Sequence, residues 1–305
     1  MLHPAAGVSV GSPLLTRNAS IHQLAAHLAL RFTRAEGGAP GTRMIVDMQE
    51  PPWRVVRAFP RQDGSSLVHL HNVSGGIVAG DQLALSVNVG PGSSALVTST
   101  GATRLYRHRA GAVDSEQNIQ IQVAEGGLLE YLPDALIPFA GARHRQRTKI
   151  FLANGATLFW WETLAPGRQA MGETFGYDRL RVHTELRTSA RPLLLENFVL
   201  EPKLRPLTST ARLGPYTHMA NFYACKVGQP PATWRELEMK LNEFCSAQSR
   251  PGVTIWGTTT LVADGIAVRG LSVSARELPS TLATVWKIAR PFLTGKEAEP
   301  PRKVY

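Results

Sequence analysis

Residues 83–92 read LALSVNVGPG and show on a small scale how this chain is built. Apolar side chains occupy every second position, at Leu83, Leu85, Val87 and Val89. This period of two is typical of a β-strand that buries one face and exposes the other. The dipeptide that follows, Pro91-Gly92, is typical of a tight turn. The stretch therefore predicts one strand and the chain reversal that ends it.

The same alternation recurs along the chain, for example over residues 119–123 and 180–186. The chain holds 27 Gly and 21 Pro residues, which is above average usage and favours frequent reversal. Dipeptides that tolerate a positive φ separate the alternating segments: Asp63-Gly64, Pro91-Gly92, Gly126-Gly127, Asn154-Gly155 and Asp264-Gly265. Many short strands divided by turns predict an all-β body.

Two late segments have helical periodicity instead. Apolar residues at helical spacing predict one α-helix over residues 233–247, with Thr233 and Glu236 in the pattern of a capping box. A second apolar stripe predicts another α-helix over residues 279–290, which Pro291 is expected to end. The sequence therefore predicts an all-β fold with two α-helices in the C-terminal third.

The length of 305 residues allows one large or two ordinary domains. No shift in composition marks a linker, so we expect a single β domain over residues 21–305 after a loose leader, residues 1–20. Two cysteines exclude a disulfide scaffold and a four-thiolate zinc site. No apolar run is long enough for a membrane span and no signal-peptide pattern is visible, so we expect a cytoplasmic protein.

Positive charge is in excess, with 33 basic against 23 acidic residues and a net charge of +10. Its most regular concentration is the run Arg143, Arg145, Arg147 and Lys149. Spacing of i, i+2 places these cations on one face of a strand. The run predicts either plain solvated surface or contact with a partner protein. A basic nucleic-acid module remains an alternative, although the run lacks the interleaved aromatic residues on which bases stack.

A glycine-rich stretch, GGIVAGD, occupies residues 75–81. It is not a P-loop, because Asp81 stands where a lysine would meet phosphates, and its spacing is not that of a dinucleotide fingerprint. Two interpretations remain. Glycine permits a tight connection between strands, or Asp81 presents an oxygen ligand at a strand end.

Several carboxylates lie in otherwise apolar segments: Glu130 and Asp134 in EYLPD, Glu162 in WWE, and Glu173 in GETF. A carboxylate in apolar surroundings must be paired, hydrated or bound to a ligand. No nucleophile or histidine accompanies them, so they favour oxygen ligands or a polar channel. A hydrolase that uses Glu130 and Asp134 as a carboxylate pair remains an alternative.

Four blocks in a fixed order carry a resemblance to a known family. They are LHNVSGGIVAGDQL at 70–83, TSTGATRLYR at 98–107, LEYLPDALIPF at 129–139 and GRQAMGETF at 167–175. Each block alone is weakly specific, but the ordered set resembles the urease accessory protein family UreD, also called UreH. The resemblance extends from about Leu24 to the end of the chain.

The resemblance implies a β-helix-like, solenoid body with two helices and no catalytic activity of its own. It also implies a complex with the accessory proteins UreF and UreG. That complex docks on apo-urease and assembles the nickel centre of urease while UreG hydrolyses GTP. Nickel is the only metal implied, as a transient cargo in an internal tunnel, with no tightly bound cofactor, no nucleic acid and no membrane partner.

Carried over block by block, the resemblance makes Asp81, Asp134 and Glu173 the candidate tunnel acids. Glu130 and Glu162 are weaker additions from their apolar context. Isolated carboxylates suit a conduit, because thiolate and imidazole clusters hold first-row metals more tightly. The run over residues 143–149 is the candidate surface for a protein partner.

Overall fold

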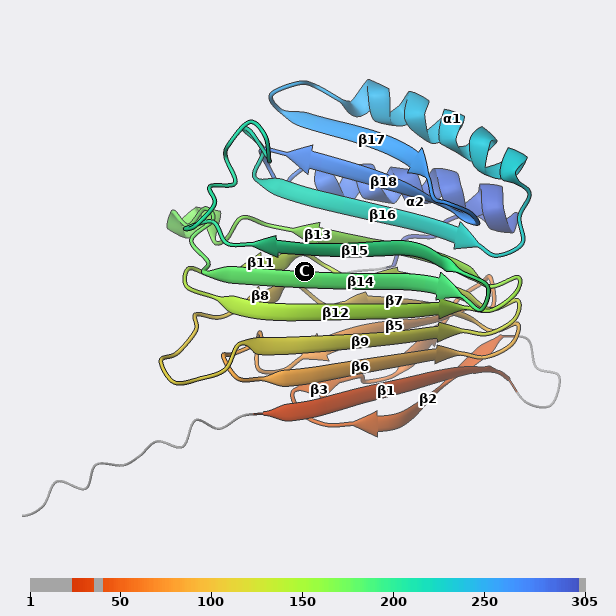
Figure 1. The fold of residues 1–305 in the computed structure, drawn as a ribbon. Helices are drawn as coiled ribbons and strands as arrows, with labels where there is room; N and C mark the ends of the chain where they lie inside the picture. The colour runs from red at the N-terminus through yellow and green to blue at the C-terminus, as the bar shows by residue number, and fades with distance from the viewer. Residues whose placement is uncertain (1–23, 36–40, 302–305) are drawn as a thin grey trace, which may run out of the picture.

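The computed structural model describes residues 24–35 and 41–301, whose strands form two β-sheets (Figure 1). The predicted leader, residues 1–20, lies outside the described residues. The division into a leader and one domain therefore stays a prediction.

The smaller sheet has seven strands, in the order β15 (Pro192–Leu200), β14 (Arg179–Thr188), β12 (Arg143–Leu152), β9 (Ser115–Val123), β6 (Gln82–Val89), β1 (Ala25–Arg34) and β2 (Thr42–Gln49). The main path of the larger, eleven-stranded sheet is β17 (Thr254–Thr260), β18 (Gly265–Ser272), β16 (His218–Lys226), β13 (Thr157–Leu164), β10 (Leu128–Leu132), β7 (Ser94–Ser99), β5 (Ser66–Asn72) and β3 (Trp53–Arg54). Three short strands branch from this path: β4 (Ala58–Pro60), β8 (Thr103–Leu105) and β11 (Leu136–Pro138).

From β5 to β14 the chain passes back and forth between the two sheets. Neighbours within each sheet, such as β6 with β9 and β7 with β10, therefore run parallel. The short turns β6–β7, β9–β10 and β12–β13 lie at one end of the sandwich. The longer connections β5–β6, β7–β9, β10–β12 and β13–β14 lie together at the other end, which we call the loop end.

The prediction of a mostly β fold with two helices in the C-terminal part is confirmed. The alternating segments form β6, β9 and β14, and a residue with positive φ stands at each of the five predicted turns. Within the described residues the two sheets are separate layers, and neither closes on itself. The solenoid character of the body stays a prediction.

Two details of the helices differ from the predictions. The first helix, α1 (Pro231–Gln248), begins with Pro230 as N-cap, so Thr233 lies inside the first turn and the capping box does not form. A proline at the first helical position has a preset φ and no N–H group that needs a cap. The second helix, α2 (Leu278–Thr294), contains Pro291 and ends only at Gly295 in the left-handed conformation. Burial of Leu293 in the last turn helps to offset the hydrogen bond that proline removes.

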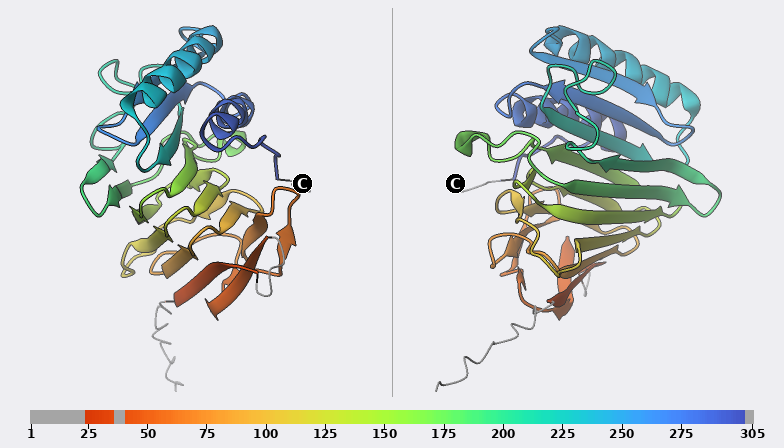
Figure 2. Two further views of the ribbon diagram at one scale, coloured as in Figure 1. Left: turned by 90° about the vertical axis from the view of Figure 1, so that its right-hand side faces the viewer. Right: turned by 60° about the vertical axis from the view of Figure 1, so that its left-hand side comes forward.

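The hydrophobic core has two parts, one on each face of the larger sheet. Between the sheets, Leu28, Leu85 and Leu158 belong to one cluster of buried side chains. On the other face, α1 and α2 pack against the strands, with Leu237 and Trp286 in a second cluster. Figure 2 shows both helices beside β16, β17 and β18. Among residues 24–35 and 41–301, no helix covers the face of the smaller sheet that points away from the core.

The glycine-rich segment GGIVAGD forms most of the connection from β5 to β6 and contains a tight turn. Gly75 and Gly80 have φ values of +78° and +90°, in the region that favours glycine. The backbone N–H of Val78 donates to Asp81 Oδ2 at 2.8 Å and closes the turn. Gly76 has no room for a side chain, since a Cβ there would lie 2.5 Å from the carbonyl oxygen of Arg104. The interpretation as a strand connection thus has a direct steric basis.

We expect Gly76→Ala to lower the free energy of unfolding by about 1–3 kcal/mol, the usual cost of forcing extra atoms into a packed site. The clash involves backbone, which cannot move aside as a flexible side chain can. Gly257→Ala is the matched control, because its Cβ would meet no atom within 4 Å. Denaturant titration of both variants measures the difference. Equal stabilities would contradict the steric account of this turn.

Candidate functional site

A small cavity lies between the two sheets near the loop end. Its volume is about 80 Å³, and strands of both sheets contribute to its wall. Two carboxylates face it, Asp134 and Glu162. The other polar side chains around it are Thr103, Gln117, Tyr131, Gln146, Thr163 and Asn221. The cavity therefore offers carboxylate, amide and hydroxyl oxygens from strands of both sheets and from the segment after β10.

Glu162 lies on β13 with its carboxyl group directed into the interior. Gln146 of β12, in the opposite sheet, donates from Nε2 to Glu162 Oε1 at 3.1 Å. Burial raises the pKa of Glu162 to about 8, and the negative charge of Glu196 adds to the rise. Glu196 itself is held in an ion pair with Arg269. Glu162 is therefore mostly neutral at pH 7, which is unusual for a glutamate that faces a cavity.

Asp134 stands just after β10, where the chain leaves the larger sheet. Ser99 at the end of β7 donates from Oγ to Asp134 Oδ2 at 2.8 Å and accepts the Asp134 backbone N–H at 2.7 Å. This exchange fixes the side chain at the cavity wall. Asp134 also lines a neighbouring groove, so it stands between two hollows.

Two grooves adjoin the cavity and share parts of its wall. One, of about 430 Å³, shares Pro133, Asp134, Thr163 and Leu164 with it. The other, of about 260 Å³, shares Thr103, Gln117, Tyr131 and Pro133. The cavity is thus the middle of three neighbouring hollows, and the segment around Pro133 borders all three.

Two of the acids expected in a tunnel lie outside the lining of these hollows. Asp81 closes the turn described above, and burial raises its pKa. Glu173 accepts a hydrogen bond from Arg168 Nε at 2.9 Å and from the backbone N–H of Ala140 at 3.1 Å. The Arg168 guanidinium holds the pKa of Glu173 below its usual range. Both carboxylates therefore have structural partners at the loop end.

Glu130 lies on the opposite face of β10 from the cavity. It is fully buried and accepts a hydrogen bond from Trp286 Nε1 at 2.6 Å and from Arg290 Nε at 3.1 Å, both on α2. Its neighbour Tyr131 faces the cavity instead. Glu130 and Asp134 consequently do not share a cavity, and the carboxylate pair required by the hydrolase alternative is not assembled.

The amide side chains of the cavity were not among the residues predicted from the sequence: Gln117, Gln146 and Asn221. A signal for two of them was present. Gln117 continues the inward-facing row of Ile119 and Ile121, and Gln146 stands in the same row as Ile150. A polar residue at an inward position of an alternating strand needs a buried partner or a cavity.

Three further observations concern metal binding, membrane spanning and the cysteines. No group of three or more His, Cys, Asp or Glu side chains is arranged to hold a metal ion within residues 24–35 and 41–301. In the same part of the chain, no helix combines the length and apolarity needed to cross a membrane. Cys225 and Cys245 are both buried free thiols.

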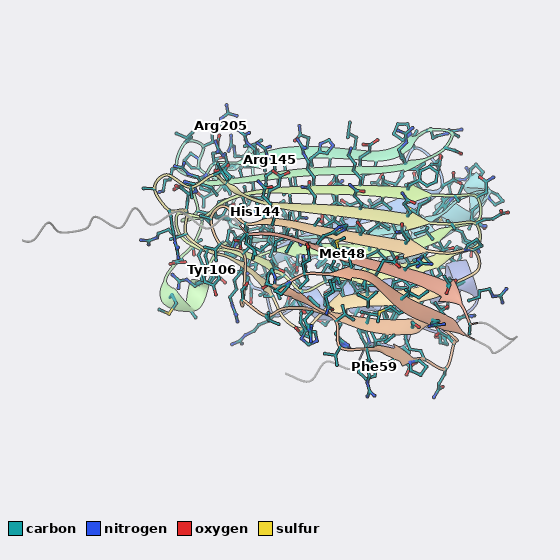
Figure 3. All side chains as sticks on the ribbon, turned by 90° about the horizontal axis from the view of Figure 1, so that it is seen from below. Met48, Phe59, Tyr106, His144, Arg145 and Arg205 are labelled. Carbon is teal, nitrogen blue, oxygen red and sulfur yellow. The ribbon has the colours of Figure 1, made fainter. Side chains whose placement is uncertain are left out.

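The basic run lies on the outer face of β12, as its spacing predicts. Arg147 and Lys149 are exposed, whereas His144 and Thr148 point inward and are buried. Figure 3 shows the side chains of the outer face projecting from the smaller sheet, with Arg145 labelled. Arg143 at the start of the run forms an ion pair with Asp178.

Comparison with known proteins agrees with the resemblance in the sequence. The family model described as UreD urease accessory protein matches residues 24–305. A urease accessory protein UreD from Herpetosiphon aurantiacus is 41% identical over 285 residues, which covers 93% of this chain and 98% of the relative. The proteins of the same name from Marinobacter nauticus and Pseudomonas fluorescens are 32% and 31% identical, over 94% and 90% of this chain and 97% and 94% of their own lengths. This chain belongs to the UreD urease accessory protein family.

Proposed function

We propose that this chain acts in urease maturation as a non-catalytic scaffold and nickel conduit. In this proposal it joins UreF and UreG in the cytoplasm, the complex docks on apo-urease, and Ni²⁺ reaches urease while UreG hydrolyses GTP. Membership of the UreD family supports the role in urease maturation. The conduit is supported by the cavity that Asp134 and Glu162 face.

The observation that carries the conduit is the row of three neighbouring hollows with two carboxylates at its centre. A buried carboxyl group is costly unless it is paired or bound to a ligand. Glu130 and Glu173 are paired with arginines, whereas Glu162 has Gln146 as its hydrogen-bond donor and faces the cavity. The conduit proposal therefore rests on Asp134 and Glu162, and Asp81, Glu130 and Glu173 are assigned to the fold.

A protonated Glu162 suits a site through which a metal ion passes better than a site that stores the ion. A cation that binds this carboxylate at neutral pH must first displace its proton, because metal ligands bind in the deprotonated form. The competition weakens the contact and favours release. Amide oxygens of Gln117, Gln146 and Asn221 offer further weak contacts in the same space. These donors would hold a divalent ion briefly along its way.

Glu162→Gln combined with Asp134→Asn tests the conduit. We expect the initial rate of nickel loading into apo-urease to fall by about tenfold, since loss of even an indirect metal contact typically lowers affinity by about 10–100-fold. The measurement is nickel per urease active site over time, beside the yield of the co-purified complex, which we expect to stay unchanged. Both substitutions keep the size of the side chain.

Glu173→Gln is the informative control, because Glu173 lies outside the three hollows. Normal loading with this variant is the expected result. Slow loading with Glu173→Gln and normal loading with the cavity variants would place the nickel path elsewhere at the loop end. Normal loading with every variant would overturn the conduit.

A further inference from the structure

The outer face of the smaller sheet carries a cluster of positive side chains that the proposed nickel passage does not use. It consists of Arg145, Arg147 and Lys149 on β12 with Arg181 and His183 on β14, and we call it the basic face. The parallel register of the two strands places Arg145 beside Arg181 and Arg147 beside His183. These side chains line one surface hollow of about 510 Å³, together with Glu185 and Asn197.

Two pairs of neighbouring arginines on β12 and β14 differ in whether they have acidic partners. Arg143 and Arg179 also stand side by side, but each has an acidic partner, Asp178 and Asp114 respectively. The next pair, Arg145 and Arg181, forms no ion pair with any side chain of the described residues. Like charges directly opposite each other on a sheet destabilise it. The repulsion between Arg145 and Arg181 is therefore not balanced by nearby carboxylates, whereas that between Arg143 and Arg179 is.

The spacing of the cations is regular. Alternate residues of one strand stand about 6.6 Å apart and adjacent strands about 4.8 Å apart. An extended polypeptide has the same repeat of about 6.6 Å between alternate side chains. Acidic residues at every second position of such a segment would therefore meet Arg145, Arg147 and Lys149 in turn.

Exposed apolar side chains border the basic face. Leu195 and Val199 on the adjacent edge strand β15 are 67% and 47% exposed, and Phe151 at the end of the β12 row is 38% exposed. Protein interfaces combine apolar contacts of this kind with complementary charge. Phe151 is the one Phe, Tyr or Trp on the outer faces of β12 and β14, whereas single-stranded nucleic acid requires a series of stacking aromatics.

We propose that the basic face binds an acidic, extended segment of a partner protein. Its carboxylates would neutralise the repulsion between Arg145 and Arg181, and its apolar residues would cover Leu195 and Val199. A second copy of this chain cannot pair through this same face, because it would present the same positive charges. This inference stands apart from the nickel passage, which lies on the other side of the smaller sheet.

The test uses the full chain and a short synthetic peptide with glutamate at every second position and leucine or threonine between. We expect Arg145→Gln with Arg181→Gln to weaken peptide binding at low salt by at least about tenfold, as close interfacial charge pairs usually contribute that much or more. Thermal stability of this variant should be unchanged or higher, because the cross-strand repulsion is gone. Arg147→Gln with Lys149→Gln is a second variant that tests the row on β12 alone.

The matched control is Arg235→Gln with Lys287→Gln, which removes the same charge from exposed positions on α1 and α2. It should change peptide affinity by less than about twofold, the range expected of distant screened charges. An equal loss in the control would show a non-specific charge effect and overturn the proposal. Absence of peptide binding, or tighter binding of a single-stranded oligonucleotide of equal charge to the same residues, would overturn it as well.

Discussion

Replacing Glu130 with alanine is expected to lower the free energy of unfolding by about 3–5 kcal/mol, the usual cost of removing one partner from a buried ion pair. Glu130 is the carboxylate partner of two guanidinium groups that are almost fully buried, those of Arg290 and Arg61, and Arg290 keeps only Asp63 as an acidic partner. Trp286 loses the acceptor of its indole N–H at the same time. The substitution therefore removes contacts from two residues of α2 and from β10 at once.

The network around Arg290 shows why the effect should be large. Beyond Glu130, its guanidinium bonds to Asp63 and to the backbone carbonyls of Lys296 and Glu297. It therefore joins α2 and the chain after it to β10 and to the turn before β5. Losing Glu130 weakens the docking of the whole C-terminal segment on the larger sheet.

Equilibrium unfolding of Glu130→Ala, compared with Glu236→Ala, measures this prediction. Glu236 forms an exposed pair with Lys240 on α1, for which about 0–1 kcal/mol is expected. A double variant, Glu130→Leu with Arg290→Met, should recover only part of the loss. A buried ion pair can be replaced by apolar residues of similar volume, but Asp63 and the carbonyls of Lys296 and Glu297 lose Arg290 as their donor. A Glu130→Ala protein as stable as the Glu236→Ala control would refute the structural role assigned to this carboxylate.

Local features of the fold were predictable from the sequence because their causes are local. Period-two alternation marks β6, β9 and β14, and the glycine turns follow from positive φ values. The pairing of strands is not local. Val87 lies beside Ile121, which is 34 positions further along the chain, and no short-range pattern specifies that register. The alternation of the chain between two sheets became visible only with the structure.

The distribution of the acids was predictable only in part, for a reason seen in EYLPD. Glu130 and Asp134 are four positions apart, so simple alternation would place both on one face. The strand ends at Leu132, however, and Pro133 turns the chain, which brings Asp134 to the cavity while Glu130 stays under α2. Apolar context identified these acids as unusual. Whether each acid lies in an ion pair or at the cavity depends on the position of α2, which is more than 140 positions away in the sequence.

Glu162→Gln is expected to stabilise the protein near pH 8 and to leave it almost unchanged near pH 5, within the window set by a pKa raised from 4.5 to about 8. Between these two values the folded state holds a proton that the unfolded state has released. Stability from this group is therefore complete below about pH 4.5 and is lost as the pH rises towards 8, by about 1.4 kcal/mol per pH unit. Glutamine keeps the shape and the acceptor for Gln146 but never ionises. Its advantage should grow to several kcal/mol at the upper end of the window.

Chemical denaturation of both proteins at a series of pH values tests this, with Glu173→Gln as a control of opposite sign. Arg168 lowers the pKa of Glu173, so that variant should lose stability at neutral pH. Parallel pH profiles for the wild type and Glu162→Gln would mean that folding does not raise the pKa of Glu162, so that the group is ionised at neutral pH, as in a water-filled cavity. A divergence that appears as the pH rises would instead mean that the chain keeps an acid in its interior at a cost in stability. Such a cost in stability is expected for a carboxylate whose role is to bind a metal ion in place of its proton. Nickel loading by the wild type should then rise over the same pH range, and loading by Glu162→Gln should not.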